Sequence, residues 1–417
     1  MATHSDVASP PSTAAGVEVR NLYKVFGSDP QSVIRRLKAG ASKETALKEM
    51  KHVVAVNDIS FSVLPGEIFV VMGLSGSGKS TLIRCINRLI EPSAGQILIE
   101  GDDIATASDT ALRQARLHKI AMVFQHFALF PHRTVGENVE YGLKIRGLAA
   151  SIRRVKAMEM LELVGLANVA DRFPRELSGG MQQRVGLARA LAVEPKVLLM
   201  DEPFSALDPI TRGELQDELM MVRKRLNTAI VFITHDIDEA LKLGDRIAVM
   251  RDGSFVQVGK GADIALRPQG DYVSAFTRDV DLTRLLDAGS IMRSITISSR
   301  ADIRTATAKD GDDEYLLDGD DHPIGFRPSI DRGEAAHRTF PAVHEAAKLN
   351  SFVSACKNGH PVAVIDQSGR LRGVITPADI LAALASGSSR DNSVVQLGCP
   401  DAATIVPLVS VAQAKRG

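Results

Sequence analysis

The chain of 417 residues contains no tryptophan, only three cysteines and no long apolar segment. Cys85, Cys356 and Cys399 are scattered without the spacing of a metal site, which is typical of reduced thiols in a cytosolic protein. No apolar run approaches the roughly 18 residues that a membrane-spanning helix needs. We therefore expect any function at a membrane to be exerted from its surface or through a partner.

A basic excess and a signal peptide are absent as well. Lys and Arg together number 50, as do Asp and Glu, so the formal net charge is zero. Proteins that bind nucleic acid are more often basic, and we expect no nucleic-acid partner. The N-terminal MATHSDVASPPSTAAG has neither a basic start nor an apolar core, so we expect no secretory signal there. Its Ser, Pro, Thr and Ala content predicts disorder over residues 1–16.

The chain does contain a long alternation of strand and helix patterns. Over residues 17–265, short apolar runs alternate with helical periodicity, which predicts an α/β domain around a largely parallel sheet. Residues 27–51 interrupt this domain with a charged insert that is mostly compatible with helix. The insert has more basic than acidic residues: Arg35, Arg36, Lys38, Lys43, Lys48 and Lys51 against Asp29, Glu44 and Glu49. Residues 266–287 predict a helical linker.

The pattern of predicted strands and helices changes after about residue 288. Residues 313–326 and 362–375 each have the pattern of a strand, a tight turn and a second strand. The second of these segments is followed by TPADILAAL, a capped helix start. This weak internal repeat predicts a smaller α+β domain over residues 288–388. The tail at 389–417 shows no clear pattern.

A glycine-rich loop, GLSGSGKST, begins at Gly73 between an apolar strand pattern and a helix pattern. Gly76 and Gly78 let the backbone curl so that successive N–H groups point toward one place, where a helix also begins. Such a loop binds phosphate, with Lys79 on the β- and γ-phosphates and the Ser80 hydroxyl on Mg²⁺. The alternative interpretation is a Gly/Ser turn with an incidental lysine.

Two further apolar strands end in residues that can act on a phosphate. VLLMDEP ends in Asp201, placed to hold Mg²⁺ directly or through water, and Glu202, which could orient an attacking water. AIVFITHD ends in His235, which the sheet could bring to the same edge. The alternatives are an acidic strand end in solvent and a histidine with a packing role.

The segment LSGGMQQR predicts a second helix start suited to an anion. Ser178 can cap a helix whose first residues are Gly179 and Gly180. Because the chain has two such helix starts but one lysine loop, we infer that the second start completes a site in trans, in a dimer. An ordinary capped helix is the alternative, although two glycines destabilise a helix start.

Together with Gln125 in MVFQHFALFPH and SALD at 205–208, these motifs resemble the nucleotide-binding subunit of an ABC transporter, in the order typical of that family. The resemblance covers residues 17 to about 260. It implies a P-loop NTPase fold with a RecA-like core and a helical subdomain at 126–190. It also implies a head-to-tail homodimer that holds two ATP molecules between the lysine loop of one chain and the LSGG of the other.

The resemblance assigns a role to each motif residue. Glu202 is the catalytic base and His235 contacts the γ-phosphate. The ATP-binding residues are Phe26, Gly73, Ser75, Gly76, Ser77, Gly78, Lys79, Ser80, Thr81, Gln125 and Asp201, of which Ser80, Gln125 and Asp201 serve Mg²⁺. Phe26 is expected to stack on adenine, with Tyr23 as the fallback. The residues that act in trans are Leu177, Ser178, Gly179, Gly180, Gln182 and Asp208.

The segment between Gln125 and the next helix pattern is apolar although it should be a loop. Phe127, Leu129, Phe130 and Pro131 either form a hydrophobic staple or, as the resemblance implies, face the coupling helix of a membrane partner.

The C-terminal segment GVITPADILAAL resembles a CBS domain, in which Thr376 and Asp379 would hold an adenine nucleotide. The first repeat lacks this match, because GFRPSI stands in the corresponding place, and a purely structural pair of repeats is equally open. The insert at 27–51 either lies near anionic lipid headgroups or is a solvated helix.

The cassette, the insert and the CBS-like pair together resemble the ATPase subunit of glycine betaine/proline importers. This resemblance implies integral-membrane permease subunits, an indirect solute-binding partner and a peripheral place on the cytoplasmic face of the bacterial inner membrane. The alternatives are an importer of choline, carnitine or an amino acid, a soluble ABC ATPase that acts on DNA or ribosomes, and a non-catalytic nucleotide sensor.

Overall fold

The computed structural model describes residues 15–43, 45, 51–125, 127–300, 303–308, 314–327, 340–358 and 361–388. Nearly all of the segment predicted to be disordered, part of the predicted insert, the whole tail at 389–417 and Cys399 lie outside the described residues. The chain divides into two compact units. The first runs to Ser290 and includes Ala346–Phe352, and the second comprises Ile291–Glu345 and the chain from Val353 onward.

A six-stranded sheet forms the centre of the first unit, with the strand order β10-β9-β3-β8-β7-β6. Five of these strands are parallel and only β10 is antiparallel, which confirms the predicted largely parallel sheet. The strands are β3 (Ile68–Met72), β6 (Ile120–Val123), β7 (Val197–Asp201), β8 (Ala229–Thr234), β9 (Arg246–Arg251) and β10 (Ser254–Gly259).

Alternate residues of the central sheet pack into two different cores, because successive side chains of a strand point to opposite faces. On β3, Phe69 and Val71 contribute to one core, whereas Ile68, Val70 and Met72 contribute to the other. The first core also contains residues of α3 (Lys79–Ile86). The second contains residues of α8 (Pro209–Leu226), α9 (Ile237–Leu243), α10 (Gly261–Leu266) and α11 (Gly270–Thr277).

A four-stranded antiparallel sheet, in the order β2-β1-β4-β5, contributes to the first core. Its strands are β1 (Val17–Phe26), β2 (Val53–Val63), β4 (Ala94–Ile99) and β5 (Asp102–Asp103), and α4 (Asp109–His118) follows them. The helix α1 (Pro30–Lys38) lies within the predicted insert. It buries Val33 and Ile34 against Tyr23, Val25 and Val54 of this sheet.

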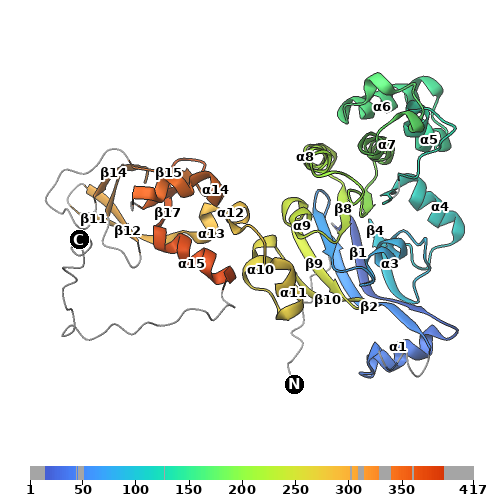
Figure 1. Cartoon of the computed structure of the whole chain (residues 1–417), viewed down its shortest axis with the longest axis horizontal. Helices are drawn as coiled ribbons and strands as arrows, with labels where there is room; N and C mark the ends of the chain where they lie inside the picture. The colour runs from blue at the N-terminus through green and yellow to red at the C-terminus, as the bar shows by residue number, and fades with distance from the viewer. Residues whose placement is uncertain are drawn as a thin grey trace, which may run out of the picture. The chain divides into compact units, whose positions relative to one another are not determined.

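The helices α5, α6 and α7 form a separate group in the first unit (Figure 1). They span Val135–Ile145, Ala150–Leu163 and Gly179–Ala192, with short 3-10 helices at Ala167–Val169 and Pro174–Glu176 between α6 and α7. Their apolar faces pack on one another in a core of their own. Among the described residues, no helix combines the length and the apolar character required to cross a membrane.

The second unit is built on a seven-stranded sheet in the order β14-β13-β12-β11-β17-β16-β15. All neighbouring pairs are antiparallel except β15 and β16. The pairs β13–β14 and β16–β17 are the two hairpins that the sequence predicts. The strands are β11 (Arg293–Arg300), β12 (Ile303–Ala308), β13 (Glu314–Leu317), β14 (Pro323–Arg327), β15 (Ala342–His344), β16 (Val362–Ile365) and β17 (Leu371–Ile375).

Both units contain further helical segments after α11. In the first unit these are α12 (Leu282–Leu285), most of α13 (Ala288–Ile291) and α14 (Leu349–Phe352). The α14 segment packs on α12, and the N–H of Leu349 donates to the carbonyl of Leu286 at 2.9 Å. The second unit adds a 3-10 segment (Val353–Asn358) and α15 (Pro377–Ser388), which follows β17 as the sequence predicts.

The fully buried Asn138 of α5 holds the turn that precedes its own helix. Its amide oxygen accepts from the N–H of Phe130, and its amide nitrogen donates to the carbonyls of Phe130, Arg133 and Thr134. We expect Asn138→Ala to lower the free energy of unfolding by about 2 kcal/mol, because buried backbone groups lose their partners. Urea unfolding of the full chain measures this, with the surface variant Gln114→Ala as the control. Equal midpoints for the two variants would contradict the prediction.

Candidate functional site

The glycine-rich loop lies between β3 and α3 and approaches neighbouring backbone so closely that two of its residues must be glycine. Gly73 and Gly78 have φ angles of 157° and 106°. A Cβ at Gly73 would lie 2.2 Å from the carbonyl oxygen of Met250, and one at Gly78 would lie 2.2 Å from that of Ala55. The following helix has no side-chain cap, so its first N–H groups are available to an anion.

Lys79 lies inside this loop. Its Nζ donates to the carbonyls of Gly73 at 2.8 Å and Leu74 at 3.1 Å, and it lies 3.6 Å from Oε1 of Glu202. Burial lowers the pKa of the lysine, while the neighbouring Glu202 opposes that shift. The hydroxyl of Ser77 is also buried and has no hydrogen-bond partner. A buried ammonium group and an unpaired hydroxyl in one loop fit a phosphate ligand.

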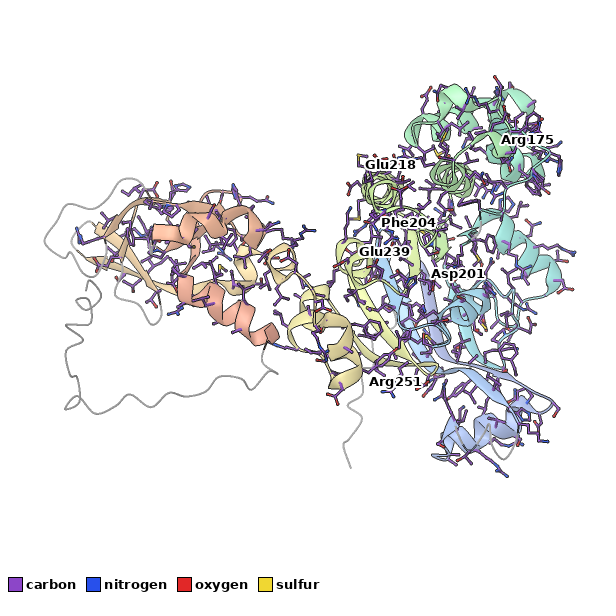
Figure 2. All side chains as sticks on the ribbon, in the orientation of Figure 1. Arg175, Asp201, Phe204, Glu218, Glu239 and Arg251 are labelled. Carbon is purple, nitrogen blue, oxygen red and sulfur yellow. The ribbon has the colours of Figure 1, made fainter. Side chains whose placement is uncertain are left out.

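The carboxyl end of β7 meets the end of this loop through the contact of Asp201 with Ser80. Figure 2 labels the position of Asp201. Its carboxylate is buried and accepts from the hydroxyl of Ser80 at 2.8 Å and from Nη2 of Arg84 at 3.2 Å. A hydroxyl and a carboxylate side by side are hard oxygen donors of the kind that Mg²⁺ prefers. The predicted pair Ser80 and Asp201 therefore fits Mg²⁺. The contact from Arg84 was not predicted.

Glu202 follows β7 in a left-handed conformation, with a φ of 46°. Its N–H donates to the carbonyl of Ile233 at 3.1 Å, and its own carbonyl accepts from the hydroxyl of Ser205 at 3.0 Å. The carboxylate lies 3.1 Å from Nδ1 of His235 and 3.6 Å from Nζ of Lys79. A non-glycine residue rarely adopts this conformation unless its surroundings hold it there. The strand ends thus bring together the predicted base, histidine and lysine.

The remaining predicted ATP-binding residues differ in how far they are exposed to solvent. Ser75 and Gly76 are exposed, and Ser80 and Thr81 are half-buried. Gln125 is exposed on the loop after β6.

The two aromatic candidates for adenine stacking differ in accessibility. Phe26, at the end of β1, is 43 % exposed, and Nζ of Lys24 lies 4.8 Å from its ring centroid. Tyr23 is only 4 % exposed and is buried beneath α1 with Nζ of Lys38 over its ring. Burial in that environment raises the pKa of Tyr23 to about 12. A base can stack only on an accessible ring, so the structure favours Phe26 over the fallback Tyr23.

The residues predicted to act in trans have two kinds of environment. Ser178 and Gly179 are exposed, and the Ser178 hydroxyl caps α7 by accepting from the N–H of Met181 at 3.3 Å. Leu177 is buried, and Gln182 donates to the carbonyls of Leu177 and Pro174, so both stabilise the turn from within.

The other two trans residues are Gly180 and Asp208. A Cβ at Gly180 would lie 2.4 Å from Cγ2 of Thr211, so this glycine permits the close approach of α7 and α8. Asp208 caps α8 by accepting from the N–H groups of Ile210 and Thr211, and these hydrogen bonds hold the pKa of its carboxyl below the usual range.

The apolar loop after Gln125 is attached to the helical group. Leu129 packs against the core of α5, α6 and α7, and Phe130 lies 4.5 Å from the ring of Tyr141. Arg189 of α7 donates to the carbonyls of Phe127 and Ala128. The staple interpretation therefore accounts for Leu129 and Phe130, whereas Pro131 is exposed.

The two residues assigned to a CBS ligand contact each other. Oδ2 of Asp379 accepts from the N–H of Thr376 at 2.8 Å and from its hydroxyl at 2.7 Å, and Oδ1 accepts from Nε of Arg293 at 2.5 Å. The carboxylate thus caps the start of α15 and pairs with β11. A ligand at this place would compete with these contacts.

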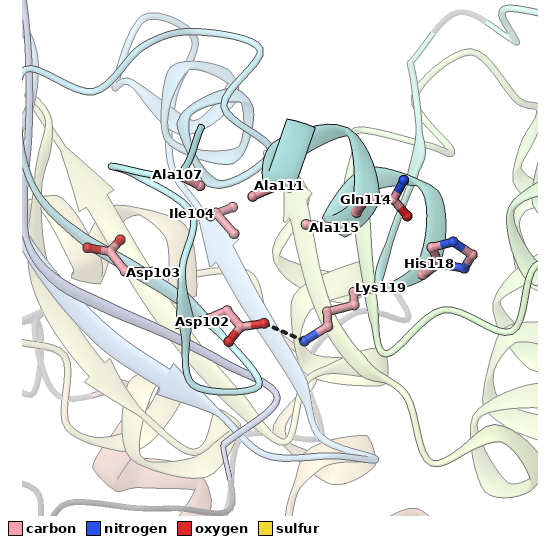
Figure 3. A pocket seen from close by; sticks show the side chains of 9 residues that line it. All are labelled: Asp102, Asp103, Ile104, Ala107, Ala111, Gln114, Ala115, His118 and Lys119. Carbon is pink, nitrogen blue, oxygen red and sulfur yellow. Dashed lines mark hydrogen bonds and ion pairs between the residues drawn. The ribbon is translucent and has the colours of Figure 1, made fainter. Parts of the chain in front are cut away.

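A groove of about 570 Å³ lies beside α4, apart from the residues predicted to bind ATP (Figure 3). Asp102 and Lys119 form an ion pair of 2.8 Å across one side of it. Its other lining residues are Asp103, Ile104, Ala107, Ala111, Gln114, Ala115 and His118. Within the described part of the chain, no cluster of three or more His, Cys, Asp or Glu side chains is arranged to hold a metal.

Tyr272 of α11 contacts the glycine-rich loop and was missed by the sequence analysis. Its hydroxyl accepts from the N–H of Leu74 at 3.3 Å and donates to the carbonyl of Met250 at 3.2 Å. The ring packs edge-on against Phe276, with the guanidinium of Arg251 over its face. No motif marks Tyr272, because the contact depends on how α11 packs against the sheet.

Comparison with known proteins gives consistent matches. The family model described as ABC transporter matches residues 56–205. The glycine betaine transport ATP-binding protein OpuAA of Bacillus subtilis is 42% identical over 393 residues, which cover 90% of this chain and 94% of the relative. The glycine betaine/carnitine transport ATP-binding protein GbuA of Listeria monocytogenes is 40% identical over 90% of this chain and 99% of its own length.

Other matches cover a smaller share of the chain. The glycine betaine/proline betaine transport system ATP-binding protein ProV of Salmonella typhimurium is 54% identical over 280 residues, or 67% of this chain and 70% of its own length. A solved dimeric structure of the ATP-binding cassette MJ0796 with ADP and Pi is 32% identical, with a TM-score of 0.50, and the match covers 58% of this chain and 98% of that one.

The hydroxyl of Tyr272 provides a test of how the loop is held. We expect Tyr272→Phe to weaken ATP binding about five-fold, because losing one hydrogen bond to the loop costs about 1 kcal/mol. Equilibrium titration with ATP measures the change. Tyr141→Phe removes a hydroxyl far along the chain from the loop and serves as the control. Unchanged affinity in Tyr272→Phe would show that the loop does not need this contact.

Proposed function

The chain belongs to the family of ATP-binding subunits of ABC transporters, and from this premise we propose that it hydrolyses ATP to drive import of glycine betaine and related solutes. The observation that carries the proposal is the contact of Glu202 with both Lys79 and His235 at the carboxyl edge of the central sheet. This contact places a carboxylate, an ammonium group and an imidazole around one site. Phosphoryl transfer to water needs charge stabilisation and positioning of the water.

Each side chain contributes a separate part of the hydrolysis. Lys79 and the N–H groups of the glycine-rich loop neutralise the charge of the β- and γ-phosphates. Glu202 orients and polarises the attacking water, and His235 holds the Glu202 carboxylate at 3.1 Å and contacts the γ-phosphate. Ser80, Asp201 and Gln125 would hold Mg²⁺, which when bound supplies further charge neutralisation at the phosphates.

We propose that two copies of the chain close head to tail around two ATP molecules. The exposed Ser178 and Gly179 start α7, so the loop that they form is accessible to the nucleotide of a partner copy. Asp208 lies at the exposed start of α8, where it can couple the two sites. The dimer with ADP and Pi formed by the similar cassette supports this arrangement.

The remaining partners are proposed from the similar proteins. Permease subunits embedded in the membrane receive the work of ATP hydrolysis, and a solute-binding protein delivers the cargo to them. The chain would then lie peripherally on the cytoplasmic face of the bacterial inner membrane. Glycine betaine is the solute that the names of the matched OpuAA, GbuA and ProV have in common. The name of GbuA also includes carnitine, which is therefore the second candidate.

The insert and the second unit carry separate proposals. The helix α1 buries Val33 and Ile34 and leaves Arg35, Arg36 and Lys38 exposed, which suits contact with anionic lipid headgroups. Thr376 and Asp379 are proposed to bind an adenine nucleotide. Their mutual hydrogen bonds support the alternative, in which this pair of repeats has a structural role.

Two substitutions separate binding from hydrolysis. We expect Glu202→Gln to bind ATP as well as the unmodified chain does and to lose about 100-fold or more in kcat, because an amide cannot act as the base. We expect Lys79→Ala to lose ATP affinity instead, because the buried cation is gone. Equilibrium binding of ATP and phosphate release are measured on both variants. Normal turnover in Glu202→Gln would refute the assigned base.

The transported solute is tested in a complete transporter. The chain is co-expressed with its permease and solute-binding protein and reconstituted in vesicles with ATP inside. We expect glycine betaine to stimulate phosphate release and to accumulate in the direction of import. Stimulation by carnitine alone would support the second candidate. Stimulation by DNA or ribosomes and by none of the solutes would overturn the import proposal.

A further inference from the structure

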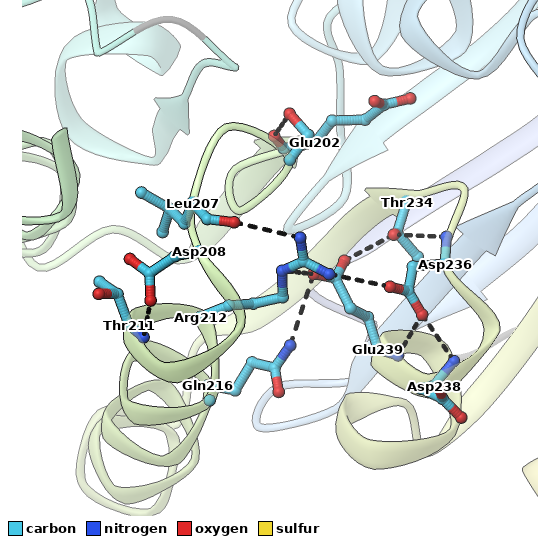
Figure 4. A network of polar contacts seen from close by, with 12 residues as sticks. Glu202, Leu207, Asp208, Thr211, Arg212, Gln216, Thr234, Asp236, Asp238 and Glu239 are labelled. Carbon is cyan, nitrogen blue, oxygen red and sulfur yellow. Dashed lines mark hydrogen bonds and ion pairs between the residues drawn. The ribbon is translucent and has the colours of Figure 1, made fainter.

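The two residues on either side of His235 are held by a polar network behind the catalytic edge (Figure 4). The hydroxyl of Thr234 donates to Oε2 of Glu239 at 2.6 Å and accepts from the N–H of Asp236 at 3.0 Å. Oδ2 of Asp236 accepts from Nη1 of Arg212 at 3.1 Å. The backbone on both sides of the histidine is therefore restrained.

Arg212 connects this turn to the start of α8. Its Nη2 donates to the carbonyl of Leu207 at 3.2 Å, and its Nε lies 3.7 Å from Oε1 of Glu239. Leu207 directly precedes Asp208, the residue proposed to couple the two sites of the dimer. One guanidinium thus contacts both the turn that carries His235 and the turn that carries Asp208, as Figure 4 shows. We call these contacts the Arg212–Glu239 network.

Capping of α9 does not require the side chains of Arg212 and Glu239. The N–H groups of Asp238 and Glu239 already donate to Oδ1 of Asp236, which satisfies the start of that helix. Glu239 is only 5 % exposed, and burial raises the pKa of its carboxyl. A buried carboxylate and its arginine are costly to desolvate and are often no more stabilising than apolar side chains. The geometry therefore points to a role other than stability.

We propose that Arg212 and Glu239 are positioning residues for hydrolysis: they hold the His235 turn and the Asp208 turn in one fixed relation. The proposal rests on the proposed function, because it takes His235 as a γ-phosphate contact and Asp208 as a contact of the partner copy. Closure of the dimer at Asp208 is then transmitted through Arg212 to the turn that holds His235 at 3.1 Å from Glu202. ATP binding to the lysine loop involves different residues and does not depend on this relation.

The first test compares two arginines of the same helix. Arg212→Met keeps the side-chain stem and removes the charge and the hydrogen bonds. We expect kcat to fall about 30-fold and KM for ATP to change less than about two-fold, because the lost restraint acts on the reacting geometry rather than on binding. Arg212→Lys keeps the positive charge but not the planar guanidinium with its several N–H donors, so it should recover part of kcat.

Arg223→Met is the matched control. Arg223 also lies on α8, pairs with Asp245 at 2.6 Å and donates to the carbonyl of Gly66 at 2.7 Å, but it contacts neither turn. We expect Arg223→Met to lower the thermal unfolding midpoint and to keep kcat within about two-fold of the unmodified chain. Equal losses of kcat in the two methionine variants would assign Arg212 a purely structural role and overturn the proposal.

A second variant keeps the test decisive if Arg212→Met folds poorly. Without Arg212, Glu239 is a buried carboxylate that lacks its cation, and Glu239→Gln removes that charge. We expect the Arg212→Met/Glu239→Gln double variant to have a higher thermal unfolding midpoint than Arg212→Met. We expect its kcat to stay as low as that of Arg212→Met. Recovery of both together would show that the loss of activity came from unfolding.

The unmodified chain distinguishes this inference from the proposed function. If it releases no phosphate from ATP in the complete transporter, the proposed function fails. If it hydrolyses ATP and Arg212→Met behaves like Arg223→Met, only the positioning role fails.

Discussion

The close approach of the glycine-rich loop to its neighbouring strands is the constraint on which the rest of the site depends. At Gly73 and Gly78 no Cβ fits beside the carbonyls of Met250 and Ala55. The loop therefore curls tightly, the next helix begins without a side-chain cap, and the ammonium group of Lys79 is drawn inside. A buried cation surrounded by carbonyls is suited to a phosphate, because an anion compensates its desolvation.

Sheet topology extends this constraint into a catalytic arrangement. The strands β3, β8 and β7 are parallel neighbours, so the segments that follow them emerge at one edge of the sheet. Lys79, Glu202 and His235 meet there within hydrogen-bond or ion-pair distance. Behind this edge the Arg212–Glu239 network connects the histidine turn with the start of α8. The position of His235 is thereby related to a surface that would face a second copy of the chain.

The second unit is joined to the first by more than one connection of the chain. Ala346–Phe352 belongs to the first unit, although the residues on both sides of this segment belong to the second. Within the first unit this segment packs on α12. The N–H of Ala288 donates to the carbonyl of Ala347, and the N–H of Leu349 donates to the carbonyl of Leu286. Truncation at about residue 288 would therefore also remove part of the first unit.

The sequence alone determined the features that are local: the glycine loop, the acidic end of one strand, the capped Ser-Gly-Gly helix start and the two C-terminal hairpins. Each of these depends on neighbouring residues and on strand or helix periodicity. Only the tertiary structure showed that Phe26 is accessible and Tyr23 is buried, because burial beneath α1 depends on how an insert packs. It alone revealed Arg84, Tyr272 and the Arg212–Glu239 network. Their contacts join residues distant in sequence, such as Leu74 and Tyr272, which are 198 positions apart, and no local pattern encodes such a pairing.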